Sequence, residues 1–161
     1  MTNAHVLAAM KRGGITDPAL TMRVAREVGL PLAYACTVLE LETSGGRNVF
    51  GSDSGYHGPY KGMEVTRERY LAYLRYANET GERNGVGFCQ LTSAGLQERA
   101  DELGGCYLPQ PNVHVGFDYL RSLMRSSGSA ELGFTHYNGS AAYGRRAMEK
   151  AAASCCSENS A

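Results

Sequence analysis

TVLELETSGGRNVFGSD, residues 37–53, is the stretch that decides the fold, because a buried helix ends in it and a long loop begins. The helix covers PLAYACTVLELE at 31–42, with apolar residues at positions 32, 33, 35, 36, 38, 39 and 41. This spacing leaves almost no polar face, and a helix that is apolar all round is buried. It ends on the carboxylate of Glu42, and the break Ser44-Gly45-Gly46 follows at once. We therefore predict a buried central helix whose last turn carries a glutamate.

Start and stop signals predict further helices on both sides of this one. Asp17 is placed as an N-cap, Pro18 takes the first helical position and Gly29 lies near the end of that helix. Residues 44–65 hold many glycines, which predicts a long loop or a small β-hairpin. The other expected helices cover 3–12, 66–81, 93–103, 111–124, 129–137 and 141–153. The predicted fold class is mainly α, a helical bundle around the buried central helix.

Length and charge exclude several classes of protein. The chain has 161 residues with 16 basic and 16 acidic side chains, and this balance argues against a nucleic-acid binder driven by bulk charge. No apolar run approaches the roughly 18 residues that a membrane span needs. The first residues, MTNAHVLAAMKRGG, carry their basic pair after the apolar stretch, the reverse of a secretory leader. We expect one domain at 1–150, a flexible tail at 151–161, and neither membrane insertion nor a nucleic-acid partner.

Glu42 is the candidate general acid. It shares a face of the helix with Val38 and Ala35, and it lies in the last turn, where the unpaired carbonyl groups make the potential negative. Burial and this potential both raise the pKa of a carboxyl group, and a protonated glutamate is what general acid catalysis requires. The alternative is a surface glutamate at a frayed helix end. Glu40, on a different side of the same helix, is the internal comparison.

Asp53 is the candidate second carboxylate. Glycoside hydrolysis commonly uses two carboxyl groups that flank the scissile bond. The alternative role for Asp53, within GSDSG, is that of a turn residue whose side chain bonds its own backbone.

Two other motifs carry polar groups that suit a binding cleft. In GVGFCQLT, Gly85 and Gly87 would let a ligand approach the backbone and Gln90 would fix a polar substrate or a water, although the glycines equally suit an ordinary turn. In HYNGS, Tyr137 is placed to hydrogen-bond a nearby carboxyl group, and Asn138 is placed either there or at a helix C-cap.

Together and in this order, the motifs resemble the goose-type lysozyme and soluble lytic transglycosylase group. Glu42-Thr43 matches the catalytic Glu of that family, which is followed by Ser or Thr at the end of a buried helix. Gly87-Phe88-Cys89-Gln90 matches its Gly-x-x-Gln motif and Tyr137-Asn138 its Tyr-Asn motif. The wider run, ETSGGRNVFGSD with NGVGFCQLT, GGCY and YNGS, is similar to the peptidoglycan-cleaving domain of endolysins from phages of actinobacteria. The resemblance covers roughly residues 18–150.

The resemblance implies a lysozyme-like fold and cleavage of the glycan strands of bacterial peptidoglycan, by hydrolysis or by transglycosylation. It implies a protein that acts as a monomer without metal or organic cofactor, is made in the host cytoplasm and reaches the wall after release. Glu42 would be the general acid, with Asp53 preferred over Glu82 as second carboxylate. The chain departs from the family in a longer stretch between Asp53 and Asn84, and in Cys89 at a place often held by methionine. The residues implied for substrate binding are Thr43, Ser44, Asn48, Phe50, Gly87, Gln90, Tyr137 and Asn138.

Two rival functions remain open at this point. A peptidoglycan peptidase would use Cys89 as nucleophile with His136 or His114 as base. A non-catalytic wall-binding module would need Gln90 and the loops but not Glu42. Spacing alone does not show whether Cys89 and Cys106 form a disulfide.

Overall fold

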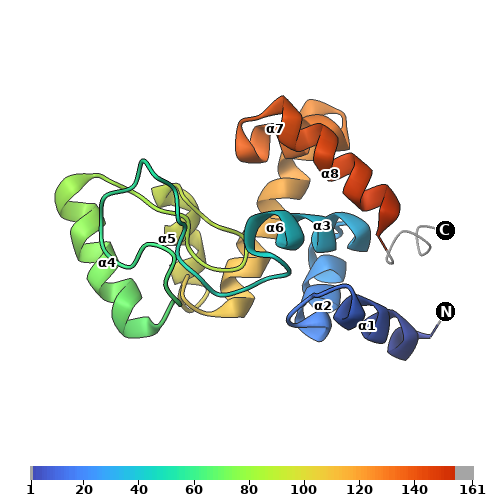
Figure 1. Ribbon diagram of the computed structural model, residues 1–161, viewed down its shortest axis with the longest axis horizontal. Helices are drawn as coiled ribbons and strands as arrows, with labels where there is room; N and C mark the ends of the chain where they lie inside the picture. The colour runs from blue at the N-terminus through green and yellow to red at the C-terminus, as the bar shows by residue number, and fades with distance from the viewer. Residues whose placement is uncertain (1, 155–161) are drawn as a thin grey trace.

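The computed structural model describes residues 2–154, and this part of the chain is mainly helical (Figure 1). Strand pairing within it is confined to isolated bridges, between Val49 and Glu64, Phe50 and Val86, and Val86 and Leu91. The mainly α fold class is therefore confirmed. The helices are α1 (Asn3–Arg12), α2 (Pro18–Val28), α3 (Leu32–Thr43), α4 (Arg67–Thr80), α5 (Ala94–Glu102), α6 (Pro109–Ser127), α7 (Ala130–Asn138) and α8 (Ala141–Ala153).

Local capping fixes most of the helix ends. At the start of α2 the Asp17 carboxylate accepts a hydrogen bond from the Leu20 N–H at 3.0 Å, as its N-cap position predicts. Gly29 ends α2 in the left-handed region at φ 70°. Helix α6 begins at Pro109, two residues before Pro111 where we expected it. Both prolines fit there because the backbone N–H groups of the first helical turn have no intrahelical acceptor, so a proline at these positions removes no helix hydrogen bond.

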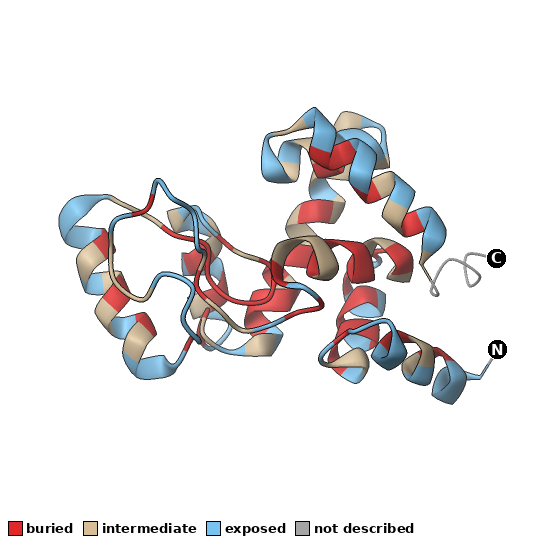
Figure 2. Cartoon of the chain, in the orientation of Figure 1, coloured by how far each residue is buried: buried red, intermediate tan, exposed pale blue. Residues whose placement is uncertain are grey.

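Helix α3 is the buried helix that the sequence predicts. No residue from Leu32 to Thr43 is exposed, and Figure 2 shows the helix in the buried and intermediate colours. Ser44 then adopts a left-handed conformation at φ 55°, and the Gly45 N–H closes the helix by donating to the Leu39 carbonyl at 3.0 Å. Helices α2 and α8 pack against α3. The end of α3 is thereby held at a fixed place, with Glu42 in its last turn.

Two lobes lie on either side of α6 (Figure 1). The helical lobe contains α1, α2, α3, α7 and α8, and the α4 lobe contains α4, α5 and the loops 44–66 and 81–93. Helix α6 packs against α2 and α7 on one side and α5 on the other, so it belongs to the core of both lobes.

An aromatic cluster builds the core of the α4 lobe. Phe50, 1% exposed, packs against Tyr60 and Tyr73 with ring centroids 5.9 and 5.5 Å apart. Tyr70 adds a further ring contact with Tyr73 at 6.0 Å. The long loop therefore folds around side chains, and the bridge between Val49 and Glu64 stands where we considered a small hairpin.

Helix α8 ends at Ala153, where the sequence predicted the end of the last helix. Residues 151–153 of the expected tail at 151–161 are therefore helical, and Ala151 among them is 4% exposed. Residues 155–161 lie outside the described part of the chain. Among residues 2–154, no helix is long and apolar enough to cross a membrane.

Candidate active site

A polar cavity of about 520 Å³ lies where the two lobes meet. Its walls come from the end of α3, the loop after Phe50, the segment 83–92 and the end of α7. Six of the residues singled out in the sequence converge on it, which are Glu42, Asp53, Gly85, Gln90, Tyr137 and Asn138. The other lining residues are Gly51, Ser52, Gly55, Tyr56, Arg83, Asn84 and Thr92.

Glu42 reaches the cavity from the last turn of α3 with its carboxyl group largely withdrawn from water. Burial raises the pKa of Glu42 above its ordinary value, because the charged form loses hydration. The Tyr143 hydroxyl, which donates to Oε1 of Glu42, and the nearby Arg146 guanidinium lower that pKa in part. Burial is the largest of these effects, so the carboxyl group holds its proton to a higher pH than an exposed glutamate does.

The phenol that contacts Glu42 is not the one that the sequence indicated. Tyr137 lines the cavity, but its hydroxyl donates to the Cys89 carbonyl at 2.7 Å. Tyr143, in the first turn of α8, holds Glu42 instead. The buried positions 143, 147 and 151 form a stripe on α8 that can be recognised in the sequence. The stripe does not indicate which other helix it packs against.

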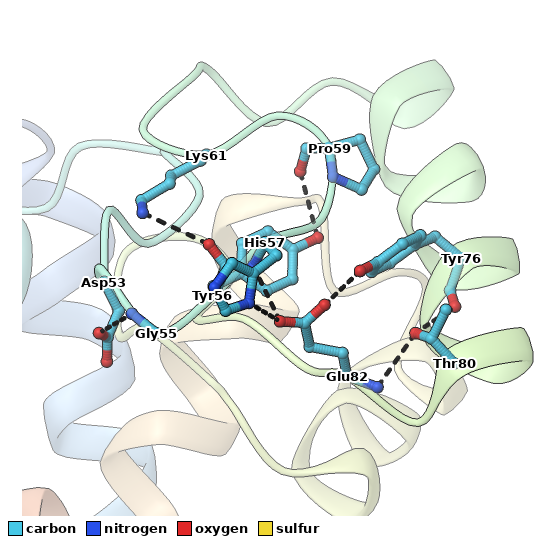
Figure 3. Close-up of polar contacts among 9 residues, drawn as sticks. All are labelled: Asp53, Gly55, Tyr56, His57, Pro59, Lys61, Tyr76, Thr80 and Glu82. Carbon is cyan, nitrogen blue, oxygen red and sulfur yellow. Dashed lines mark hydrogen bonds and ion pairs between the residues drawn. The ribbon is translucent and has the colours of Figure 1, made fainter.

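Asp53 is an exposed residue on the wall of the cavity. Its Oδ1 accepts a hydrogen bond from the Gly55 N–H at 2.9 Å, so it also forms the turn that was its alternative role (Figure 3).

Glu82, the other candidate for the second carboxylate, does not line this cavity. Its Oε1 accepts hydrogen bonds from the backbone N–H of His57 at 2.8 Å and from Nδ1 of the same residue at 3.1 Å. The Tyr76 hydroxyl donates to its Oε2, and this bond is the largest of the effects that lower the pKa of Glu82 (Figure 3). Glu82 thus anchors the loop that carries His57 to the end of α4, and Asp53 is the acidic side chain that shares the cavity with Glu42.

Gln90 shapes the cavity through an unusual backbone conformation. It lies at φ 51°, and its Nε2 donates to the carbonyls of Val49 at 2.9 Å and Gly87 at 3.0 Å. Gly85 gives the Gln90 side chain its space, since a Cβ at Gly85 would lie 2.5 Å from Oε1 of Gln90. The group that approaches the Gly85 backbone closely is therefore the Gln90 side chain of the protein itself and not a ligand.

Five of the residues implied for substrate binding lie outside the cavity lining, which are Thr43, Ser44, Asn48, Phe50 and Gly87. Thr43 is buried and its hydroxyl donates to the Phe88 carbonyl at 2.8 Å, which ties α3 to the segment 83–92. Nδ2 of Asn48 donates to the carbonyls of Val65 at 3.3 Å and Tyr107 at 3.0 Å. These contacts place the side chains behind the wall, where they hold it in position.

A buried amide on α6 is the central support of this wall. Asn112 is 0% exposed and accepts a hydrogen bond from the Cys89 N–H at 3.0 Å. Its Nδ2 donates to the carbonyls of Val86 at 2.8 Å and Cys106 at 3.2 Å. Gly87 passes so close that a Cβ there would lie 2.4 Å from Nδ2 of Asn112, and its φ of 76° also favours glycine.

Cys89 does not have the surroundings of a nucleophile. It is fully buried, and burial, followed by the nearby Glu42 carboxylate, raises the pKa of its thiol well above the ordinary value. A reactive cysteine needs the opposite, an accessible thiol with a lowered pKa. Of its two suggested bases, His136 is exposed and His114 is half-buried. Cys89 and Cys106 are both free thiols in this structure.

Arg83 and Asn84 also line the cavity, although neither belongs to a motif that indicated the site. Asn84 is 3% exposed, and its Nδ2 donates to the Gly51 carbonyl at 2.9 Å, which joins two walls of the cavity. Among the described residues, no group of three or more His, Cys, Asp and Glu side chains is placed to hold a metal ion. Comparisons with protein-family models, with curated proteins and with solved structures find no match for this chain.

Proposed function

We propose that the protein cleaves the β-1,4 bond between N-acetylmuramic acid and N-acetylglucosamine in peptidoglycan, with Glu42 as general acid, on a lysozyme-like fold. The observation that carries the proposal is the Glu42 carboxyl group, whose pKa is raised by burial at the wall of a polar cavity. A carboxylic acid that keeps its proton toward neutral pH is suited to protonate a leaving oxygen.

The contacts of Glu42 suggest which oxygen donates. Oε1 accepts from the Tyr143 hydroxyl, so Oε2 is the oxygen left to carry the acidic proton. That proton passes to O4 of the departing N-acetylglucosamine as its bond to C1 of the muramyl residue breaks.

The developing positive charge at C1 is stabilised by the nearby Asp53 carboxylate. Water then bonds to C1 and gives one proton to the Glu42 carboxylate, which regenerates the acid and leaves a reducing end on the muramyl residue. If the muramyl 6-hydroxyl attacks instead, it returns its proton to Glu42 and the product is a 1,6-anhydro sugar.

The biological role that we propose is the breakdown of a bacterial wall during release of a phage. The cavity is lined mainly by hydroxyl, amide and backbone groups, which suits a sugar chain better than an apolar ligand. The protein would act as a monomer, since one chain supplies both carboxyl groups.

The test compares two matched substitutions on one helix. Glu42→Gln removes the proposed acid, whereas Glu40→Gln removes a carboxylate that pairs with Lys150 at 2.7 Å and does not line the cavity. Fragments released from purified peptidoglycan are identified by mass spectrometry. We expect sugar-cleaved fragments from the wild type and from Glu40→Gln, and at least about a hundredfold lower rate from Glu42→Gln.

Several outcomes would contradict the proposal. Equal cleavage by Glu42→Gln would exclude Glu42 as the acid. Intact glycan with cut peptides would indicate a peptidase, and binding without any cleavage by the wild type would indicate a wall-binding module. The terminus of the sugar fragments, reducing or anhydro, distinguishes hydrolysis from transglycosylation.

A further inference from the structure

Arg83 brings a positive charge to the wall of the cavity. Its Nη1 donates to Oε1 of Gln97 at 3.0 Å, and its Nη2 donates to Oδ1 of Asn78 at 3.1 Å. Gln97 is 0% exposed and is itself held by bonds to the carbonyls of Asn84 at 3.0 Å and Leu91 at 2.8 Å. The guanidinium is therefore anchored on a buried, hydrogen-bonded side chain of the α4 lobe.

The partners of Arg83 are neutral amides, so its charge is not compensated by a carboxylate. The ion pairs of the described residues join Arg23 to Glu27, Arg99 to Asp118, Lys150 to Glu40 and His57 to Glu82, and none includes Arg83. Both acidic side chains of the cavity, Glu42 and Asp53, likewise form no ion pair with it. A half-buried guanidinium without an acidic partner is suited to bind an anion that arrives with a ligand.

The donor groups that remain on Arg83 define the chemistry of that anion. A guanidinium has five N–H groups in a planar fork, and the bonds to Gln97 and Asn78 occupy two of them. The remaining donors fit the two oxygens of a carboxylate. Neutral sugar hydroxyl groups would leave the positive charge of the Arg83 guanidinium without a negative partner.

We propose that Arg83 makes the cavity selective for a glycan that carries a carboxylate on its muramyl substituent, in preference to a neutral N-acetylglucosamine polymer. This inference rests on the proposed function of the same cavity, and it adds the property that separates peptidoglycan from chitin as substrate. The carboxylate belongs either to the lactyl group of a peptide-free muramyl residue or to the attached peptide. Both sources present the same chemistry to Arg83.

The first experiment measures binding in the Glu42→Gln protein, which keeps the cavity but lacks the proposed acid. Calorimetry compares muramyl oligosaccharides with a free lactyl carboxylate, their methyl esters, peptide-bearing oligosaccharides and chitin oligosaccharides of equal length. We expect at least about tenfold tighter binding of a carboxylate form than of the ester or chitin, and a smaller preference at high ionic strength. If the free lactyl form shows the preference, the lactyl group is the source of the carboxylate. If the peptide-bearing form shows it, the attached peptide is the source.

The second experiment changes the arginine. Arg83→Gln removes the charge, Arg83→Lys keeps it without the planar fork, and Arg75→Gln is the control on the exposed face of α4. In the Glu42→Gln background, Arg83→Gln should abolish the preference, Arg83→Lys should keep part of it and Arg75→Gln should leave it unchanged. In the active protein, Arg83→Gln should raise KM for the acidic glycan about tenfold with kcat changed less than about threefold.

The outcomes separate this inference from the proposed function. Equal binding of acid, ester and chitin forms by the Glu42→Gln protein would overturn the inference even if Arg83→Gln does not fold. Glu42-dependent cleavage with a preference that survives Arg83→Gln would also overturn it and leave the proposed function standing. Absence of glycan cleavage by the wild type would overturn the proposed function, while the carboxylate preference remains measurable by calorimetry.

Discussion

Replacing Asn112 with alanine should remove the main support of the cavity wall. Truncation leaves two buried backbone groups without their partner, the N–H of Cys89 and the carbonyl of Cys106, whereas the Val86 carbonyl keeps the bond that it accepts from the Leu91 N–H at 3.1 Å. One buried polar group left unsatisfied costs about 1–3 kcal/mol, with carbonyls toward the lower end because they have two lone pairs. The sum is about 3 kcal/mol, a large share of the 5–15 kcal/mol that stabilises an ordinary domain.

The assay is urea unfolding followed by far-UV circular dichroism, with linear extrapolation to water. The matched control is Asn138→Ala, because Asn138 is exposed at the end of α7 and its replacement should change stability by less than about 0.5 kcal/mol. We expect a lower midpoint for Asn112→Ala with an unchanged slope.

A loss below about 1 kcal/mol would refute this reasoning, because the two backbone groups would then have found other partners. The wall would not depend on Asn112, and the position of Cys89 and of the Tyr137 hydroxyl bound to it would need another explanation.

Three further predictions concern the surroundings of Glu42. Glu42→Gln should be more stable than the wild type at alkaline pH. The raised pKa of Glu42 means that wild-type stability is fully present below the unfolded-state pKa and is lost as pH rises through the folded-state value, so the difference in urea midpoints should vanish in acid. Tyr143→Phe removes a bond that lowers the pKa of Glu42, so the alkaline limb of the kcat/KM profile should move to higher pH. Tyr119→Phe should not move it. Gly116→Ala places a Cβ 2.4 Å from Cβ of Cys89, and it should lower the free energy of unfolding, measured by thermal unfolding, by about 1–3 kcal/mol. The control is Gly95→Ala, whose added Cβ meets nothing within 4 Å and should not destabilise the protein.

The elements that the sequence predicted well are those whose ends are decided locally. Asp17 caps its own helix and Gly29 ends it, so the information lies within a few residues of each boundary. The buried nature of α3 follows from its own apolar spacing. Even the turn at Asp53 was foreseeable, because its side chain bonds a backbone group two residues away.

The parts that the sequence did not reveal depend on partners far away in the chain. Tyr143 meets Glu42 across a separation of 101 residues, and Asn112 supports Val86 across 26. Arg83 looks like an ordinary loop arginine until Gln97 fixes it at the cavity. Helix periodicity shows which face is buried but not what it is buried against, so Tyr137 was the more visible phenol although Tyr143 holds the carboxyl group.

The aromatic core of the α4 lobe also determines which part of this molecule the tyrosine spectroscopic signals report on. The chain has ten tyrosines and no tryptophan. Six of the ten, Tyr56, Tyr60, Tyr70, Tyr73, Tyr76 and Tyr107, take part in the ring contacts of that lobe. Near-ultraviolet dichroism and tyrosine emission will therefore report more on the α4 lobe than on the rest of the chain, whereas far-ultraviolet dichroism samples the helices of both lobes. Recording the two signals during one urea titration therefore tests, without an added label, whether the two lobes on either side of α6 unfold together or one after the other.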